Sequence, residues 1–236
     1  MLNALDGVVL FDKPMGVTSH DVVAWVRKKL GGTKVGHAGT LDPMATGLLV
    51  LALGKGTKLA SKLTGHIKHY EGEICLGSET NTGDREGKIT RQMPIPTFTE
   101  LQIQKTMETF LGDIQQIPPM TSALHYQGKR LYQLARSGIE VPRNPRPITI
   151  YDFKLIKFCS PIIYFKVICS KGTYVRTLCS DLANRLDTVG HLNALRRLQS
   201  GPFLVKDAIT MDHLNTSQKF PENCVLPISE ILSIIQ

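Results

Sequence analysis

One short stretch of the sequence presents a carboxylate in an unusual setting. Residues 36–47 read GHAGTLDPMATG, with three glycines, two alanines and two threonines around one acidic residue, Asp42. Because a proline follows Asp42, its backbone is restricted to an extended or turn conformation. The small neighbours let another chain, or a nucleotide, approach the backbone closely. A carboxylate in this setting suits a nucleophile or a general base.

Two other interpretations of this stretch stay open at this point. An Asp-Pro pair often begins a turn, and an aspartate can simply cap the element that follows. The glycines can also cradle a phosphate, but a phosphate-binding loop needs G-x-x-x-x-G-K-[ST], and Gly54-Lys55-Gly56-Thr57 lacks that register. The sequence also has no G-x-S-x-G elbow, no G-x-G-x-x-G and no zinc-deaminase signature. We therefore expect an enzyme that works without a metal or an organic cofactor.

The cysteines and histidines support the same expectation. His66 and His69 have an H-x-x-H spacing, but no further ligand follows at a suitable distance, so we expect no metal site. The cysteine count is odd and no C-x-x-C pair occurs, which argues against a disulfide framework and favours a reducing cytoplasm. The five cysteines are Cys75, Cys159, Cys169, Cys179 and Cys224.

The overall composition is that of a folded, water-soluble protein with a basic surface. The 236 residues are 42% hydrophobic and 20% charged, and the net charge is +8. A basic protein is compatible with a polyanionic partner, although many soluble proteins are simply basic. The longest uncharged apolar run, residues 48–53, is too short to span a bilayer, so we expect no membrane association.

The elements that must position Asp42 follow from hydrophobic periodicity and turn signals. We expect a helix capped by Ser19 and ending at Gly31, a helix over 99–111 capped by Thr99, and a helix over 173–186 capped by Thr173. Strands are predicted at residues 7–11, up to 53, 70–76, 148–158, 162–169 and 191–198. Strands outnumber helices and hairpins are common, which predicts an α+β fold with a mixed, mostly antiparallel central sheet.

Residues 120–147 are predicted to form an insertion outside this core. The segment carries five lysines and arginines, has Tyr126 and Tyr132 interleaved with them, and ends in prolines. Cations meet phosphates and aromatic rings stack on bases, so this composition suits an RNA-binding surface. The alternative is an ordinary solvated loop.

Five blocks of the sequence form a distinctive set: DKPMGVTSHDVV (12–23), KVGHAGTLDPMATGLL (34–49), KHYEGEICLG (68–77), SKGTYVRTLCSDLA (170–183) and LRRLQSGPF (195–203). The combination of G-H-x-G-x-L-D-P-x-A-x-G with S-K-G-T-Y-x-R-T is highly specific. Together the blocks resemble the TruB family of tRNA pseudouridine synthases. They follow the order and spacing of the family, and the match runs from residue 7 to about residue 214.

The resemblance implies a reaction and the fold of the pseudouridine synthases. Members of the family convert the uridine at position 55 in the T-arm of tRNA to pseudouridine, breaking the N1–C1′ bond and forming a bond to C5. The target base is extruded from the RNA before it reacts. The implied partner is therefore tRNA, without a metal, a cofactor or a membrane, and we expect a cytoplasmic monomer.

The resemblance also assigns roles to residues. It makes Asp42 the catalytic nucleophile and pairs Arg176 with its carboxylate, since a neighbouring arginine favours the charged form. Whether Asp42 attacks the sugar or the base, or assists a glycal intermediate, stays open. The Lys13-Pro14 block is expected to support the site, and Asp84 belongs to a flanking loop.

Four further residues are expected to bind the substrate. The resemblance places Tyr70 against the target base, Tyr174 and Leu195 in the uridine pocket, and His37 against the RNA or in the space that the base leaves. Taken alone, the two tyrosines are typical half-buried aromatic residues, and Leu195 is a typical core residue.

The resemblance further predicts how the chain is divided. Residues 1–214 are expected to form the catalytic domain, with an RNA-binding insertion at about 120–147, and residues 215–236 a short extension. Many members continue into a PUA domain, which we do not expect here, so the insertion should carry more of the recognition. A guide-RNA-dependent synthase of the dyskerin type and a catalytically inactive RNA chaperone are the alternative functions.

Overall fold

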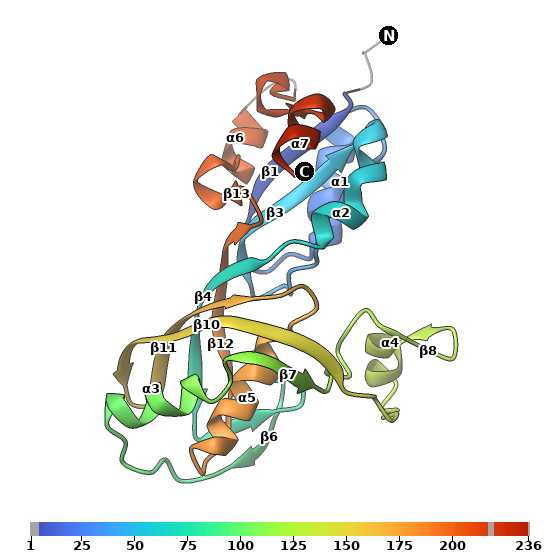
Figure 1. Ribbon diagram of the computed structural model, residues 1–236. Helices are drawn as coiled ribbons and strands as arrows, with labels where there is room; N and C mark the ends of the chain where they lie inside the picture. Colours follow the sequence, from blue (N-terminus) through green and yellow to red (C-terminus); the bar gives the residue numbers. More distant parts are fainter. Residues whose placement is uncertain (1–4, 217–219, 236) are drawn as a thin grey trace. The chain divides into compact units, whose positions relative to one another are not determined.

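The computed structural model (Figure 1) describes residues 5–216 and 220–235, and the chain folds as two compact units. The first unit holds the chain up to Glu71 and again from Leu195, and the second unit spans Gly72–Ala194. Strands β4 (Lys68–Leu76) and β12 (Gly190–Ser200) each carry the chain from one unit into the other. A boundary near residue 214, between a catalytic domain and an extension, stays a prediction.

Hydrogen bonds between strands give one main sheet in the order β14-β1-β3-β12-β4-β11-β10-β7. The pairs β1–β3, β10–β11 and β7–β10 are antiparallel, whereas β12 pairs with β3 in parallel. The expected α+β fold with a mixed, mostly antiparallel sheet is therefore confirmed.

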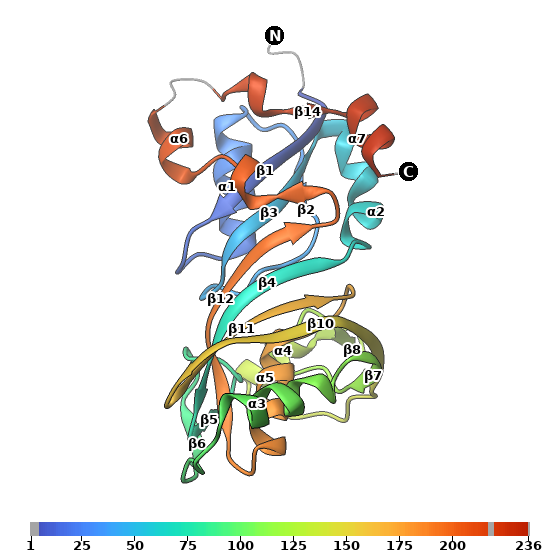
Figure 2. The ribbon, with the colours of Figure 1, turned by 60° about the vertical axis from the view of Figure 1, so that its left-hand side comes forward.

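In the first unit, two central strands are buried on both faces. These strands are β1 (Gly7–Lys13) and β3 (Thr46–Leu53), and their side chains alternate between two separate cores. One core contains α1 (Ser19–Lys29), and the other contains α2 (Ala60–Thr64) and α7 (Ile228–Ile234). Figure 2 shows α1 on one side of β1 and β3, and α2 and α7 on the other.

The remaining elements of the first unit are short. They are β2 (Val35–His37), η1 (Gly54–Leu59), β13 (Phe203–Leu204), η2 (Val205–Asp207), α6 (Met211–Thr216), η3 (Glu222–Cys224) and β14 (Leu226–Pro227). Strand β2 pairs with β3 and brings the chain to the segment that contains Asp42.

In the second unit, aromatic side chains join the sheet to its helices. Phe153 of β10 (Arg146–Cys159) meets Phe165 of β11 (Ile162–Cys169) edge to face at a centroid distance of 5.6 Å. Phe110, just after α3 (Glu100–Glu108), meets Phe153 at 6.2 Å. Such T-shaped pairs add to the stabilisation from burial itself. The unit also contains β5 (Ser78–Thr80), β6 (Ile89–Gln92), β7 (Gly112–Gln116) and α5 (Val175–Arg185).

Residues 120–147 form a small substructure between β7 and β10. It contains the hairpin of β8 (His125–Tyr126) and β9 (Lys129–Arg130), followed by α4 (Leu131–Arg136). The two turn residues, Gln127 and Gly128, have φ values of 48° and 81°, as a tight two-residue hairpin turn requires. Figure 1 shows β8 and α4 set apart from α3 and α5, so the segment is an excursion from the core of this unit.

Two of the three expected helix caps are wrong. Thr18, not Ser19, caps α1 in a capping box with Asp21, and α5 has Tyr174 at its N-cap, where Thr173 was expected. The side chain of Thr173 instead donates to the carbonyl of Ser170. The cap at Thr99 is confirmed, again as a capping box.

Candidate active site

Asp42 lies in the loop that joins β2 to β3. The turn closes where the Ala45 N–H donates to the Asp42 carbonyl at 3.1 Å, and the Asp42 side chain is half-buried. Asp42 therefore begins a turn, one of the two conformations expected for a residue that precedes proline. Gly39 and Gly47 flank it with φ values of +97° and +98°, which residues with a side chain rarely adopt.

Ser19 fixes the residue before Asp42. Its hydroxyl accepts from the Leu41 N–H at 2.9 Å and donates to the Leu41 carbonyl at 3.1 Å, and Ser19 and Leu41 are both buried. The helix start that was expected to use Ser19 as a cap uses Thr18, and Ser19 is thereby left to bind the loop.

Lys13 fixes the residue after Asp42. Its ammonium group donates to the carbonyls of Pro14, Val17 and Pro43 at 2.9, 2.7 and 3.2 Å, and the side chain is fully buried. The Gly16 N–H donates to the same Pro43 carbonyl at 2.9 Å. These contacts agree with the supporting role expected for the Lys13-Pro14 block.

Arg197 holds both ends of the loop. Its Nε donates to the Leu48 carbonyl at 2.6 Å and its Nη2 to the Gly39 carbonyl at 3.0 Å, with only 1% of the residue exposed. The two strands meet so closely here that a Cβ on Gly47 would lie 2.3 Å from the Arg197 carbonyl oxygen. The sequence analysis missed both Ser19 and Arg197 as supports of the loop, because their sequence positions give no sign of a contact with residues 39–48.

His37 ends β2, a few residues before Asp42. Burial lowers the pKa of its imidazole, and the charges of Arg197 and His20 lower that pKa further. Its Nδ1 is buried and has no hydrogen-bond partner in the part of the chain that the structure describes. A neutral imidazole of this kind suits contact with a base more than pairing with a phosphate.

Tyr70 and Leu195 also belong to the first unit, on strands that are neighbours in the sheet, β4 and β12. Their exposed fractions are 9% and 8%. The structure thus places both side chains where they are largely withdrawn from water, which fits a core role as well as a wall of a nucleotide pocket.

Tyr174 opens α5 in the second unit. Gln116, which is buried, accepts from the Tyr174 N–H at 2.8 Å and donates to the Tyr174 carbonyl at 3.1 Å. The backbone of Tyr174 is therefore held on both sides, as Ser19 holds Leu41. Its side chain is half-buried.

Arg176 lies two residues further along, in the first turn of α5, and is 5% exposed. Its guanidinium donates to the Thr82 carbonyl at 2.8 Å, to the Thr121 carbonyl at 2.9 Å and to the Thr121 hydroxyl, and lies 3.6 Å from the buried carboxylate of Asp84. Asp84, which was expected only as part of a flanking loop, is therefore a buried ion-pair partner of Arg176. The sequence analysis did not find Thr82 or Thr121. The pairing of Arg176 with Asp42 stays a prediction.

A cavity of about 510 Å³ in the second unit includes Arg176 in its wall. Thr82 and Thr121 line it as well, together with residues of the 120–147 segment such as Arg136 and Ile139. The family motif around Arg176 and this segment therefore face one space. A cavity with these cationic and hydroxyl groups suits a phosphorylated, hydrogen-bonding ligand.

Within residues 5–216 and 220–235, every helix is too short or too polar to span a bilayer. The same residues contain no group of three or more His, Cys, Asp and Glu side chains arranged to hold a metal ion.

Solved structures with this fold include Cbf5 complexes. The chain matches Cbf5 in a Cbf5-Nop10-Gar1 complex with a TM-score of 0.73 and 28% identity, covering 96% of this chain and 61% of that chain. It matches the archaeal box H/ACA sRNP Nop10-Cbf5 complex with a TM-score of 0.71 and 25% identity, covering 99% of this chain and 63% of that chain. The chain thus spans less than two thirds of the length of these neighbours. The fold is that of the pseudouridine synthases, a class of isomerase.

The family follows from the sequence. A model described as TruB family pseudouridylate synthase (N terminal domain) matches residues 27–175, and one described as tRNA pseudouridylate synthase B C-terminal domain matches residues 176–233. The chain belongs to the TruB family of pseudouridylate synthases.

Curated relatives cover nearly the whole chain. A protein named tRNA pseudouridine synthase B from Opitutus terrae is 47% identical over 227 residues, covering 96% of this chain and 90% of its own. Proteins of the same name from Syntrophotalea carbinolica and Hydrogenovibrio crunogenus are 45% and 42% identical, covering 97% and 98% of this chain and 75% and 76% of their own.

The first test concerns the support of the Asp42 loop. Ser19→Ala leaves the buried N–H and carbonyl of Leu41 without partners, so we expect a loss of about 1–3 kcal/mol in the free energy of unfolding. We also expect kcat for pseudouridine formation to fall by roughly tenfold to a hundredfold, since a small displacement of a catalytic group has that effect. Urea unfolding and single-turnover assays measure the two quantities.

The matched control for Ser19→Ala is Thr99→Ala. It removes a helix cap in the second unit, costs about 1 kcal/mol, and should leave kcat unchanged. If Ser19→Ala also kept the wild-type kcat, Ser19 would contribute to stability alone.

A second test concerns the ionisation of His37. Because its pKa is lower in the folded state, the unfolded chain binds more protons as the pH falls below about 6.5. The free energy of unfolding should therefore decrease from pH 7 towards pH 5, and His37→Gln should remove part of that decrease. His66, whose pKa is also lowered by burial, contributes in the same direction.

Denaturant titrations at several pH values measure this decrease, and NMR titration of the His37 ring locates its midpoint directly. His125→Gln, at an exposed position, is the control. A midpoint for His37 above 6.5 would contradict the proposed burial effect.

Proposed function

We propose that the protein isomerises a uridine of tRNA to pseudouridine, at position 55 of the T-arm, with Asp42 as the nucleophile. The observation that carries the proposal is the loop around Asp42. The backbone on both sides of this half-buried carboxylate is fixed by Ser19, Lys13 and Arg197. The TruB relatives, which are named for tRNA, support the choice of substrate.

The reaction needs no oxidant, reductant or cofactor. The N1–C1′ bond of the target nucleotide breaks, the detached base turns, and a C5–C1′ bond forms. C5 loses one proton and N1 gains one, so the atoms of the nucleoside are conserved. Each route to this product, by attack at the sugar, attack at the base or a glycal, requires an ionised carboxylate beside the glycosidic bond. Asp42 supplies it.

The uridine must leave the RNA stack before Asp42 can reach it. Extrusion costs a few kcal/mol. Two kinds of contact offset this cost: those that the extruded base makes with the protein, and those of protein groups that fill the place it leaves. In this proposal Tyr70 stacks on the base, Tyr174 and Leu195 complete its pocket, and His37 enters the vacated space. The neutral state of His37 at pH 7 favours that role, because a neutral ring loses less hydration among bases.

Arg176 has the role of stabilising the ionised state of Asp42. This assignment rests on its position in the S-K-G-T-Y-x-R-T motif. Its contacts with Thr82, Thr121 and Asp84 keep the guanidinium in one orientation. An oriented guanidinium pairs with a carboxylate at a lower entropic cost than a mobile one.

The 120–147 segment is proposed to bind the tRNA backbone. The last two arginines of the segment differ in how their side chains are held. The guanidinium of Arg143 donates to the Pro118 carbonyl at 3.2 Å and to the Glu140 carboxylate at 2.8 Å. Arg146 is exposed, and its side chain makes no ion pair within the described part of the chain. Arg146 is therefore the better candidate for a phosphate contact. The net charge of +8 favours association with RNA in general.

A guide-RNA-dependent synthase is the second candidate. The chain is 42–47% identical to relatives named tRNA pseudouridine synthase B but 25–28% identical to Cbf5, which favours direct action on tRNA. RNA chaperone activity is compatible with catalysis and needs no separate site. We further propose that the protein acts as a monomer in the cytoplasm.

The catalytic role of Asp42 can be tested by tritium release. Tritium at C5 of uridine passes to water when pseudouridine forms, so wild type should release it from labelled tRNA and Asp42→Asn should release none. Binding of the RNA by Asp42→Asn should stay within a fewfold of wild type, because the shape of the side chain is kept. Equal release by both proteins would remove Asp42 from the mechanism.

The phosphate contact can be tested by salt dependence. Arg146→Glu should weaken tRNA binding and lower the slope of log K against log salt by about 0.7–0.9, the value of one lost phosphate contact. Arg143→Glu should weaken binding through loss of local structure and should change the melting temperature as well. Lys105→Glu, on the exposed face of α3, makes the same charge change as a control. An unchanged slope for Arg146→Glu would mean that this residue does not meet a phosphate.

A further inference from the structure

The loop over residues 80–85, which contacts the guanidinium of Arg176, is attached to strand β12. The Leu192 N–H donates to the Gly83 carbonyl at 3.0 Å, and the Leu192 carbonyl accepts from the Arg85 N–H at 3.0 Å. Both bonds join backbone groups, so a substitution does not simply remove either of them. The loop therefore takes its position from β12.

His191 adds a side-chain contact at the same place. Its Nδ1 lies 2.8 Å from the carbonyl oxygen of Ser78, in the strand that leads into the loop. Because a carbonyl oxygen can only accept, Nδ1 carries the proton and donates. His191 is 8% exposed, and the Ser78 hydroxyl lies 3.4 Å from the same nitrogen. The imidazole thus fixes the start of the loop against β12.

Two hydroxyl groups connect the start of the loop to Arg176. The buried hydroxyl of Thr80 donates to the Asp84 carbonyl at 2.7 Å, and the hydroxyl of Thr82 donates to the Asp84 carboxylate at 2.7 Å. The Thr82 carbonyl accepts from the Arg176 guanidinium at 2.8 Å. A shift of Ser78 would therefore move both the carbonyl and the carboxylate that Arg176 contacts on this side.

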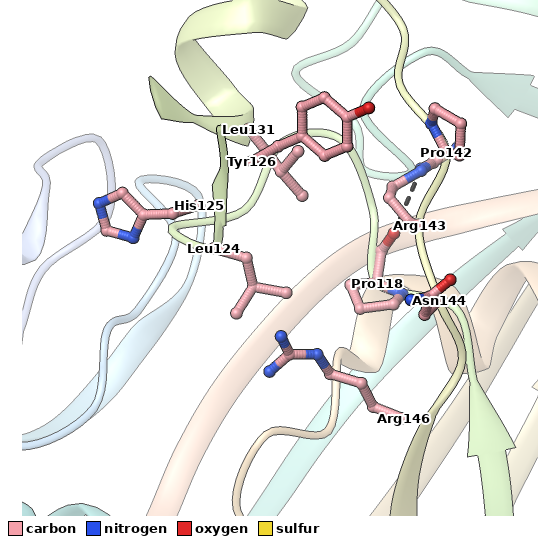
Figure 3. Close-up of a pocket in the computed structure, with 9 residues that line it drawn as sticks. All are labelled: Pro118, Leu124, His125, Tyr126, Leu131, Pro142, Arg143, Asn144 and Arg146. Carbon is pink, nitrogen blue, oxygen red and sulfur yellow. Dashed lines mark hydrogen bonds between the residues drawn. The ribbon is translucent and has the colours of Figure 1, made fainter. Parts of the chain in front are cut away.

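The Thr121 side of the guanidinium is held by a different part of the chain. Figure 3 shows Arg143 and Pro118, which close the base of the segment that contains Thr121. The dashed line marks the bond in which the Arg143 guanidinium donates to the Pro118 carbonyl, at 3.2 Å. Arg176 thus contacts two structures, one closed by Arg143 and the other held by His191.

We propose that His191 is a positioning residue of the isomerase, which holds the 80–85 loop so that the loop directs Arg176 towards Asp42. The inference rests on the proposed function, since it takes Arg176 to stabilise the ionised state of Asp42. Orientation matters because a guanidinium is planar and its donors point in fixed directions. His191 acts through the loop and takes no part in breaking or forming the bonds of the nucleotide.

His191→Leu tests the proposal, because it removes the donor and keeps a side chain of moderate size. We expect kcat for tritium release to fall by roughly tenfold to a hundredfold, since a small displacement of a catalytic group has that effect. Binding of tRNA should change by less than about twofold, because no phosphate contact is lost. The acidic limb of the pH profile of kcat should move to higher pH, since a displaced arginine favours the charged carboxylate less.

His191→Asn is the conservative variant, and it should restore kcat to within about threefold of wild type because its amide N–H can replace the Nδ1 donor. Thr188→Val is the matched control. The Thr188 hydroxyl, in a residue that is 2% exposed, donates to the Pro94 carbonyl at 2.9 Å, so this variant also loses one buried bond to a carbonyl. It should lose a similar amount of stability and keep the kcat and the pH profile of wild type.

The position of Arg176 can also be followed without an assay of catalysis. In protein labelled with ¹⁵N-arginine, the Nε–H signal of Arg176 is assigned by its absence from Arg176→Lys. This signal should shift in His191→Leu and stay in place in Thr188→Val. If His191→Leu does not fold, Thr80→Val takes its place, because it breaks the same series of contacts at the Asp84 carbonyl.

An unchanged Arg176 signal in His191→Leu would overturn the proposal. So would wild-type kcat and pH profile in that variant, or an equal fall of kcat in His191→Leu, His191→Asn and Thr188→Val, since both results mean that His191 contributes to stability alone. If wild type releases no tritium from tRNA, the proposed function fails, and the Arg176 signal then decides whether His191 positions that side chain.

Discussion

The site depends on how the backbone around Asp42 is held. The carbonyls of Gly39, Leu41 and Pro43 are bound by Arg197, Ser19 and Lys13 respectively, and these donors come from three different segments of the chain. A carboxylate that must act on one atom of a nucleotide needs a fixed position, because a loop that moves loses most of the advantage of proximity. The loop has no regular secondary structure, so its rigidity comes from these hydrogen bonds.

Two of the three donors are buried cations, which are costly to place inside a protein. Lys13 is fully buried and Arg197 is 1% exposed, and both direct their hydrogens to backbone carbonyls. Carbonyl oxygens compensate part of the lost hydration of these cations. The pKa of His37 is lowered chiefly by burial and further by the charge of Arg197, so one of the cations that hold the loop also disfavours a proton on His37.

A candidate residue for the chemistry could be proposed from the sequence, whereas the contacts that hold its loop could not. Asp42 was singled out because an Asp-Pro pair among glycines is a local signal, and its role stays a prediction. The strands were predicted because runs of apolar residues give a signal that a short window of sequence contains. The pattern also gave the strand over 162–169 with the bounds that β11 has. The cap at Ser19 was wrong because Thr18 and Ser19 are chemically similar neighbours, and the choice depends on Leu41, which is 22 residues away.

Arg197 illustrates the same limit more clearly. In the sequence it is one of two adjacent arginines in a strand, and nothing local distinguishes Arg196, which pairs with Asp12, from Arg197, which is buried against Leu48 and Gly39. Successive side chains along β12 point to opposite faces of the sheet, so Arg196 and Arg197 lie on different faces. Which of the two reaches the Asp42 loop depends on how β12 pairs with β3. That pairing is parallel and joins residues about 150 positions apart, so no window of the sequence contains it.

Arg176 fixes the root of the 120–147 segment within the second unit. Its guanidinium binds both the carbonyl and the hydroxyl of Thr121, at the start of the 120–147 segment, as well as the loop of Thr82 and Asp84. The root of the segment is therefore fixed by a residue of the family motif, while its hairpin, β8–β9, lies apart from the helices of the unit. Because Arg176 is 5% exposed and its donors are directed at Thr82 and Thr121, a displacement of Thr121 would leave a buried guanidinium with unsatisfied hydrogens, which costs several kcal/mol. The root of the segment should consequently stay in place when RNA binds, and any adjustment to the RNA should be confined to residues beyond it.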